Sequence, residues 1–391
     1  MSGTILDYLK EYGNVPFSER PFCDADSMVL SQLAYLKFDG LVPDPDSQED
    51  SGVPLAMLAK DPDREKMFAD VKYRKHNRLL FERLLAGRRF RDLTLFGYRS
   101  ITDLHQQTQF AAVTFVLRGS LTFVAFRGTD ETMVGWKEDF NLTYMDEIPA
   151  QRFAVEYLSI AASKIPVPFF VGGHSKGGHL AIYAVMHSVP EIQDRVRRIY
   201  CLDGPGFFDR MLDKESYEKI RGRITKLLPQ SSLIGMLQQQ DDDYRVVKSH
   251  GVGLLQHNLY NWKVENGELE YEEELKGHVR TRDNVINDWI YSQPPQRRKE
   301  FVDSLYQVIT SCDADNRIDF MANFSKNVSQ VMNSLRGLDE ETAQMIRNVT
   351  KALFEEAAYH FRSELGFGEN GQWEQLIEEL RKGNIPKWKK Q

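Results

Sequence analysis

The chain has 391 residues, which is long enough for one large domain or two ordinary ones. Hydrophobic residues make up 41% of it and charged residues 27%, an ordinary globular composition, and no apolar run approaches the roughly 20 residues that span a bilayer. The formal net charge of −7 gives no sign of a nucleic-acid surface, so we predict neither a nucleic-acid partner nor a transmembrane segment.

The first residues and the cysteines indicate a cytoplasmic protein. The opening stretch MSGTILDYLKEYG has early acidic residues and no apolar h-region, so it is not expected to be a secretory signal. The cysteines are odd in number, far apart and without CxxC or metal spacing, so we expect reduced thiols in small core positions. They are Cys23, Cys201 and Cys312.

Residues 1–105 are predicted to form a helical N-terminal part. Apolar residues recur at helical spacing from Met28 to Phe38, with Asp24 or Asp26 as the N-cap. Another helix is predicted over residues 64–87, where a glycine ends the pattern.

Residues 106–282 are predicted to form a mixed α/β sheet flanked by helices. Two β-branched, apolar runs meet at residues 118–120, which predicts a hairpin. Strand and helix patterns then alternate, as in α/β proteins. The dipeptide Asn266-Gly267 predicts the turn of a last hairpin. Between the hairpins we expect a helix over 151–165 and strands over 167–173, 195–206, 223–230 and 244–249.

Residues 283–391 are predicted to form a helical C-terminal extension to the sheet-containing domain, residues 1–282. They contain no convincing strand pattern, and three segments have amphipathic helical spacing. These segments are residues 297–310, 320–335 and 340–365.

The most informative motif is Gly173-His174-Ser175-Lys176-Gly177, which matches G-x-S-x-G. An apolar strand pattern precedes it and a helical pattern follows it, as a nucleophile elbow requires. The sharp turn requires small residues two positions either side of the serine, and glycines fill both places. The alternative is an idle serine in a glycine-rich turn or an anion-binding loop, but the phosphate-binding and dinucleotide-binding glycine patterns are missing. Ser175 is therefore our candidate nucleophile.

Two backbone N–H groups are candidates for an oxyanion hole. The N–H of Lys176 follows the serine at a helix N-terminus, where it can face a developing negative charge. A second donor is expected from the loop after an earlier strand. That strand ends at Phe126, Gly128 lets the chain turn close to the site, and Thr129 offers an N–H and a hydroxyl. The alternative is an ordinary β-turn after the strand.

Several segments carry a resemblance to known families. VAFRGT, with a following tryptophan and aspartate, and GGHSKGGHLA are similar to the class 3 lipases, which are α/β-hydrolases. Most of the chain more closely resembles the Mbeg-like proteins, a bacterial lipase-related family of unknown function, through PFCDADSMVLSQLAY, FRGTD, GHSKGGHLA, LDGPGF and QHNLYNW. The resemblance implies an α/β-hydrolase core, Ser175 as nucleophile and Thr129 as oxyanion residue. It also implies that Trp136 and Asp139 hold the oxyanion loop in place.

The general base is expected after the serine, because the α/β-hydrolase order is serine, acid, histidine. Position in the chain leaves His250 and His257, which lie in loop-like sequence after the last parallel strand pattern. QHNLYNW corresponds to the histidine segment of the lipase-like family, which favours His257 and keeps His250 as the alternative. The histidines set aside are His76, His105, His174, His179, His187, His278 and His360.

The acid is less clearly marked. The segment that carries it in class 3 lipases corresponds here to TKLLPQSSLIG, which has no carboxylate. Asp203 follows the next strand after the elbow and can orient an imidazole from there, although an aspartate before Gly-Pro-Gly equally suits a turn cap. The acidic run at residues 241–243 is a third source, and a Ser–His dyad without an acid is a slower alternative.

Together these features predict a serine hydrolase that cleaves an ester or related acyl bond through Ser175, His257 and Asp203, with Thr129 and Lys176 at the oxyanion. We expect no organic cofactor and no metal, and a small acyl ester or lipid as substrate, which is compatible with peripheral membrane contact; no oligomeric state is predicted. The apolar stretch SSLIGML can line an acyl pocket, form part of a lid or be a buried turn. A non-catalytic scaffold that kept a hydrolase fold is the rival interpretation.

Overall fold

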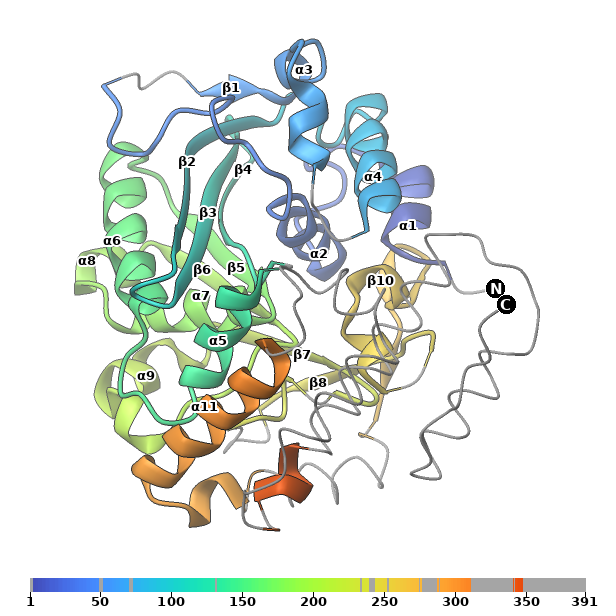
Figure 1. Ribbon diagram of the computed structural model, residues 1–391. Helices are drawn as coiled ribbons and strands as arrows, with labels where there is room; N and C mark the ends of the chain where they lie inside the picture. The colour runs from blue at the N-terminus through green and yellow to red at the C-terminus, as the bar shows by residue number, and fades with distance from the viewer. Residues whose placement is uncertain are drawn as a thin grey trace, which may run out of the picture.

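A mixed nine-stranded sheet forms the centre of the computed structural model (Figure 1). The strand order is β1-β2-β3-β4-β5-β6-β7-β8-β11, and β9 and β10 form a separate hairpin. The structure describes residues 3–48, 52–69, 73–130, 132–232, 234–238, 243–251, 253–273, 275, 287, 289–310, 340 and 342–346. The strands are β1 (Val53–Pro54), β2 (Thr94–Asp103), β3 (Thr108–Leu117), β4 (Leu121–Phe126), β5 (Phe169–His174), β6 (Val196–Leu202), β7 (Ile224–Pro229), β8 (Arg245–Val247), β9 (Val264–Glu265), β10 (Glu268–Leu269) and β11 (Tyr271–Glu272).

The sheet is antiparallel on one side and parallel in its centre. Strands β1 to β4 pair antiparallel, β4 to β8 pair parallel, and β11 is antiparallel to β8. The β3–β4 turn contains Gly119 at φ 75°, and the β9–β10 turn contains Asn266 and Gly267 at φ 52° and 78°. Both hairpins were predicted from these turn residues, because each needs backbone in the left-handed region.

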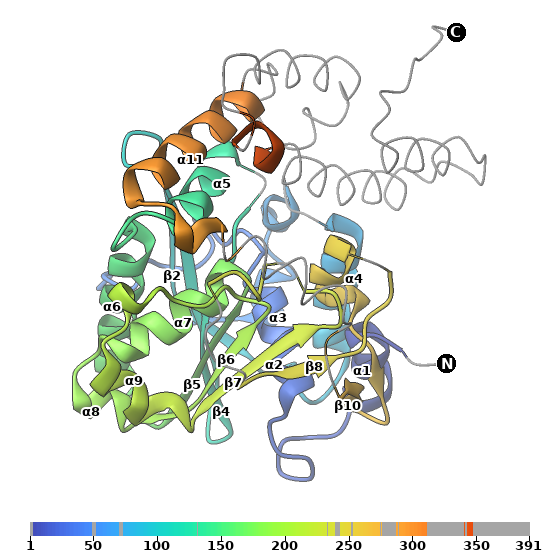
Figure 2. The same ribbon diagram turned by 90° about the horizontal axis from the view of Figure 1, so that it is seen from below.

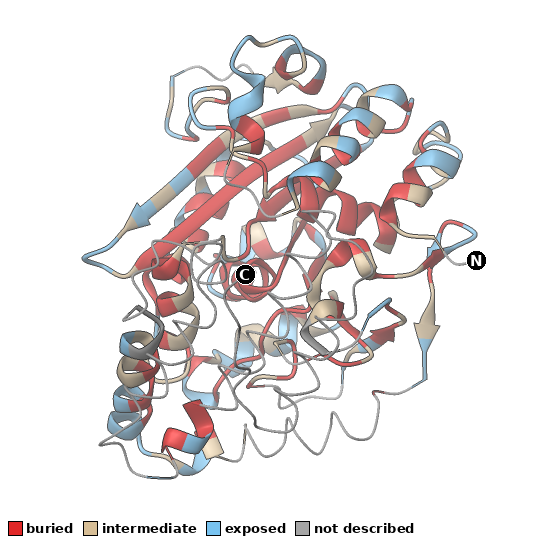
Figure 3. Cartoon of the chain, turned by 45° about the vertical axis from the view of Figure 1, so that its right-hand side comes forward, coloured by how far each residue is buried: buried red, intermediate tan, exposed pale blue. Residues whose placement is uncertain are grey.

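Helices cover both faces of the sheet (Figure 1). Alternate residues of one strand face opposite sides, so Val113 and Phe115 of β3 join the core under α1, α2 and α4, whereas Phe110 and Ala112 join the core under α6 and α7. The strands are buried along most of their length, and the outer sides of the helices are exposed (Figure 3). The helices flanking the two faces are α1 (Ile5–Tyr12), α2 (Asp24–Leu33), α4 (Arg74–Ala86), α6 (Pro149–Lys164) and α7 (Lys176–Met186).

Helix α11 (Pro295–Thr310) packs beside α5 (Met133–Asn141), as the two views show (Figures 1 and 2). It confirms the helix predicted over residues 297–310. The predicted helix at 320–335 and Cys312 lie outside the described residues, as does most of 340–365, of which 342–346 is helical. The remaining short helices are α3 (Leu55–Leu58), η1 (Arg64–Phe68), α8 (Pro190–Gln193), η2 (Asp209–Met211), α9 (Lys214–Arg221), η3 (Gly253–His257) and η4 (Leu259–Asn261).

The predicted N-cap of the second helix is wrong. Helix α2 begins at Asp24, its N-cap is Cys23, and Asp26 lies one turn inside, where its carboxylate accepts the Cys23 N–H at 3.0 Å. The same carboxylate pairs with the fully buried Arg89 at 2.6 Å. The sequence pattern did not reveal this ion pair, because its partners are far apart in the chain.

The helical N-terminal part is shorter than predicted, because β2 lies inside residues 1–105. A register shift between Phe96 and Arg99, with Gly97 at φ 59°, breaks the alternation that normally marks a strand. Arg99 is largely buried, but its guanidinium pairs with Asp44 and Glu156. The helix predicted over residues 64–87 is also divided, into η1 and α4.

No helix within the described ranges has the length and apolar character to cross a membrane.

Of the cysteines, Cys201 is buried and Cys23 half-buried, and neither forms a disulfide. Burial raises the pKa of the Cys23 thiol to about 11, which keeps it protonated near neutral pH.

Candidate active site

The candidate residues gather where the parallel strands end. Strands β4, β5 and β6 run in the same direction, so the loops after them meet at one edge of the sheet. Gly128 and Thr129 follow β4, Ser175 follows β5, and Asp203 follows β6. His257 ends η3, further along the chain after β8.

Ser175 lies at a strained turn between β5 and α7. Its φ and ψ are 58° and −131°, a conformation that non-glycine residues rarely adopt, and its N–H donates to Leu202 O at 2.8 Å. The glycines two positions before and after Ser175 allow β5 and α7 to lie close to the end of β4. A Cβ on Gly173 would lie 2.4 Å from Phe126 O, and one on Gly177 would lie 2.1 Å from the same atom. The strand–turn–helix geometry predicted from G-x-S-x-G is therefore present.

The loop after β4 lies directly against the serine. A Cβ on Gly128 would lie 2.5 Å from His174 O and 3.2 Å from Ser175 Cβ. The Thr129 hydroxyl donates to the Asp139 carboxylate at 2.6 Å, so Asp139 fixes this residue. Because that hydroxyl proton is engaged, the donor that Thr129 has for an oxyanion is its backbone N–H. The Lys176 N–H is the first in α7 and has no acceptor within the helix.

Asp139 and Ser175 line the same cavity. Burial raises the pKa of its carboxyl to about 6, against the opposing effects of the Lys176 ammonium and the Thr129 hydroxyl. The folded protein thus holds this proton more tightly than the unfolded chain does. The contribution of Asp139 to stability is therefore full below its ordinary pKa and falls as pH rises towards about 6.

Asp203 and His257 are hydrogen-bonded to each other. His257 Nδ1 lies 2.6 Å from Asp203 Oδ2, and Asp203 is fully buried. The other oxygen, Oδ1, accepts the Ser232 hydroxyl at 2.5 Å and the Gly235 N–H at 3.2 Å. Ser232 belongs to the segment that lacks the expected carboxylate, so that segment contributes a hydroxyl which positions the acid. The side-chain bonds described for Asp203 go to these groups and not to the turn at 204–206.

The alternative residues lie elsewhere. His250 is exposed, and its N–H donates to Asn261 O at 2.7 Å. In the acidic run, Asp243 pairs with Arg221 at 2.8 Å, and residues 241 and 242 lie outside the described residues. Of the two candidate histidines, the structure therefore brings His257 to Asp203.

His174, which chain position had excluded as the general base, has another role. Its Nε2 lies 2.7 Å from His257 O and its Nδ1 lies 2.8 Å from the Tyr35 hydroxyl. A carbonyl oxygen only accepts, so Nε2–H donates to it, and in the neutral imidazole the tyrosine hydroxyl then donates to Nδ1. This chain of bonds connects the segment just after α2, the elbow and the His257 segment. Adjacency to Ser175 was the sequence signal for His174, whereas Tyr35 ends the family-like segment PFCDADSMVLSQLAY, in which no role was predicted for it.

A cavity of about 170 Å³ contains both Ser175 and His257 in its lining. The hydrogen bonds among the described residues do not include one between the serine hydroxyl and this imidazole. Such bonds are often long before a substrate binds. The shared cavity places the two side chains where one substrate can contact both. Leu237 and Ile234 of SSLIGML also line it, which agrees with the acyl-pocket interpretation of that stretch.

A buried ion pair lies under the oxyanion loop. Lys176 Nζ lies 2.7 Å from Glu138 Oε2, and both side chains are almost fully buried. Glu138 also accepts the N–H groups of Gln109 and Ala150. The pair connects the first residue of α7 to α5 and thereby fixes two elements that carry candidate site residues.

Lys176→Met is expected to lower the free energy of unfolding by about 3–5 kcal/mol, because it leaves the Glu138 carboxylate buried without its cation. Adding Glu138→Gln removes that unpaired charge, so the double variant should be more stable than the single one. Urea unfolding of the single and double variants measures both effects. A double variant less stable than Lys176→Met would contradict this account.

His179, one turn after Ser175, is buried and neutral. Its Nδ1–H donates to Gly206 O at 3.0 Å and its Nε2 accepts from Gln151 Nε2 at 2.8 Å. Burial lowers the pKa of His179 to about 4. This imidazole connects the loop after Asp203 to α6 and α7.

The stabilisation that depends on neutral His179 should be lost as pH falls from about 6.5 towards 4, because the unfolded chain binds a proton there and the folded protein does not. The loss is at most about 1.4 kcal/mol per pH unit. The free energy of unfolding, measured with urea at several pH values, should therefore depend less steeply on pH for His179→Gln than for the wild type; this pH dependence is the slope compared below. His250→Gln, at an exposed position, should keep the wild-type slope. Equal slopes for wild type and His179→Gln would refute the assignment.

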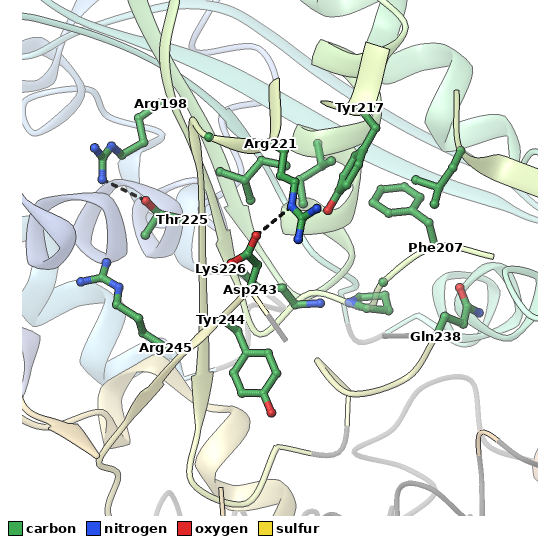
Figure 4. Close-up of a pocket in the computed structure, with 16 residues that line it drawn as sticks. Arg198, Phe207, Tyr217, Arg221, Thr225, Lys226, Gln238, Asp243, Tyr244 and Arg245 are labelled. Atoms are coloured by element: carbon green, nitrogen blue, oxygen red, sulfur yellow. Dashed lines mark hydrogen bonds and ion pairs between the residues drawn. The ribbon is translucent and has the colours of Figure 1, made fainter. Parts of the chain in front are cut away.

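A larger cavity of about 400 Å³ lies beside this site (Figure 4). Arg221 pairs with Asp243 in it, and Arg198 donates to the Thr225 hydroxyl at 3.2 Å. None of the five residues assigned to catalysis or to the oxyanion lines it, although Pro205 and Gln238 line both cavities. Size alone therefore does not indicate the candidate active site.

Comparison with known proteins identifies a family. A family model described as Mbeg1-like matches residues 84–307, which is more than half of the chain. The chain belongs to the Mbeg1-like family. This confirms the Mbeg-like resemblance, and the matched part of the Mbeg1-like chain contains all the candidate residues of the site. No curated protein and no solved structure matches the chain.

The described part of this Mbeg1-like chain has no group of three or more His, Cys, Asp or Glu side chains arranged to hold a metal ion. The chemistry that the site residues themselves can perform is nucleophilic attack, proton transfer and stabilisation of an oxyanion.

Proposed function

We propose that this Mbeg1-like protein is a serine hydrolase that cleaves a carboxylic ester or related acyl bond. The observation that carries the proposal is the Asp203–His257 hydrogen bond at a cavity that Ser175 also lines. A buried carboxylate that orients an imidazole beside a serine at a strained turn is the arrangement that activates a hydroxyl.

In the proposed reaction Ser175 Oγ attacks the substrate carbonyl carbon while His257 Nε2 removes the hydroxyl proton. Asp203 holds the imidazole through Nδ1 and stabilises the charged ring. The N–H groups of Thr129 and Lys176 stabilise the oxyanion of the tetrahedral intermediate. Collapse of that intermediate breaks the ester C–O bond, and His257 gives its proton to the leaving alcohol. Water then hydrolyses the acyl-enzyme by the reverse sequence of proton transfers.

We further propose that the fold is of the α/β-hydrolase type and related to the class 3 lipases. The chain order of Ser175, Asp203 and His257 and the parallel strands around the elbow support this. On sequence alone, the lack of a carboxylate in the class 3 acid segment favours a non-catalytic scaffold. The position of Asp203, held by Ser232 of that same segment, supports the enzyme instead.

Pre-steady-state hydrolysis of p-nitrophenyl butyrate tests the proposal. An acyl-enzyme mechanism with slow deacylation releases a burst of about one p-nitrophenol per protein molecule before the steady state. Hydrolysis that is no faster than buffer at any pH between about 6 and 9 would contradict it and favour the scaffold.

A further inference from the structure

The cavity at Ser175 has a mainly apolar wall. Trp136 and Phe140 line it from α5, where a spacing of four residues places them on one face of the helix. Ile234 and Leu237 line it from the segment after β7, and Leu259 lines it from η4. A lining of this kind suits a hydrocarbon group attached to the reacting carbonyl.

The wall formed by α5 is supported from behind. Lys137, on α5, pairs with Asp303 of α11, and Arg298 of α11 donates to Thr143 O at 2.8 Å. Thr143 itself lines the cavity. Helix α5 therefore cannot move outward without breaking these bonds.

The opposite wall is also held at several points. Asn287 Oδ1 accepts the Gln238 N–H at 3.1 Å, and Asn287 Nδ2 donates to Met236 O at 2.8 Å. The Gly235 N–H is bound by Asp203. With both walls fixed, the volume of the cavity limits how much of a hydrocarbon group can be buried in it.

That volume, about 170 Å³, is small. An apolar cavity of about 150 Å³ holds one benzene molecule, which has six carbon atoms. We propose that the cavity binds the acyl group and that the substrates are short-chain acyl esters, with acyl groups of about four to six carbon atoms. This inference rests on the proposed hydrolase function. A long fatty acyl chain would exceed the space, so its further methylenes would stay in water or strain the walls.

Steady-state kinetics on p-nitrophenyl esters from acetyl to dodecanoyl test the inference. Each methylene that the cavity buries should raise kcat/KM by roughly three- to fourfold. We expect kcat/KM to peak between butanoyl and hexanoyl and to be at least about tenfold lower for dodecanoyl. An equivalent series of butanoyl esters with longer alcohols should show a weaker dependence on length.

Leu237→Ala tests the size argument by enlarging the cavity at Ser175. It removes three side-chain carbons from the wall, so the optimum should move to acyl groups longer by about two or three carbon atoms. Leu212→Ala is the control: both leucines are partly buried against the same core, but Leu212 lines only the larger cavity. It should leave the acyl-length profile unchanged.

Each outcome decides between the possibilities. A kcat/KM that keeps rising to dodecanoyl, a stronger dependence on the alcohol than on the acyl group, or an optimum that Leu237→Ala does not move would overturn the short-chain assignment and leave the hydrolase function standing. If no ester is hydrolysed and a fluorophosphonate does not label Ser175, the proposed function fails and the inference falls with it.

Discussion

Ser175→Ala is expected to lower kcat/KM for a butanoyl ester by roughly 10⁴- to 10⁶-fold, because it removes the group that forms the acyl-enzyme. The backbone conformation at this position strains alanine as much as serine, so the variant should unfold at nearly the wild-type temperature. Ester hydrolysis and thermal unfolding, measured together, separate loss of chemistry from loss of fold.

Ser159→Ala is the matched control for this substitution. Its hydroxyl is on the exposed side of α6 and donates to Val155 O, so the variant should keep wild-type activity. A Ser175→Ala protein that retains more than about 1% of wild-type activity would show that another group is the nucleophile.

Asp203→Asn is expected to lower kcat by about 10⁴-fold with little change in KM. Asn tolerates the φ of 49° found here, and its carbonyl oxygen can still accept from Ser232 and Gly235. Its NH₂ group would then face His257 Nδ1 and donate to it. That bond moves the imidazole proton to Nε2, where the ring can no longer accept the proton of Ser175.

The measurement for Asp203→Asn is kcat and KM over a range of pH, with unfolding by urea to check the fold. Asp243→Asn is a suitable control, because that carboxylate is paired with Arg221 away from the site. Near-wild-type kcat in Asp203→Asn would show that Asp203 serves only the structure, and that the acid is elsewhere or absent.

The features that could be predicted from the sequence are those formed by consecutive residues. The elbow was predictable because β5, the turn and α7 are consecutive and their glycines are required by sterics within the same stretch. The two hairpins were predictable for the same reason. Strand β2 was missed because its bulge at Gly97 breaks the alternating pattern, and the N-cap of α2 was misassigned because Asp26 serves Arg89 far along the chain.

For the candidate site, the sequence predicted several possible acids and bases rather than one pair. Asp203 and His257 were both on the short list, but only three-dimensional contact could join them, since 54 positions separate them. The contributions of Ser232, His174 and Tyr35 were not predicted, although each lies in a motif or in a segment that resembles the family. Such hydrogen bonds depend on which loops the sheet brings together, and single-sequence patterns do not contain that information.

The most direct test of the central claim is the mass of the adduct formed with a fluorophosphonate probe, followed by peptide mapping. If Ser175 is an activated nucleophile, one probe molecule should be attached to the peptide that contains Ser175, and Asp203→Asn should slow its attachment. An intact protein that takes up no probe, or that carries it only on another residue, would contradict the account.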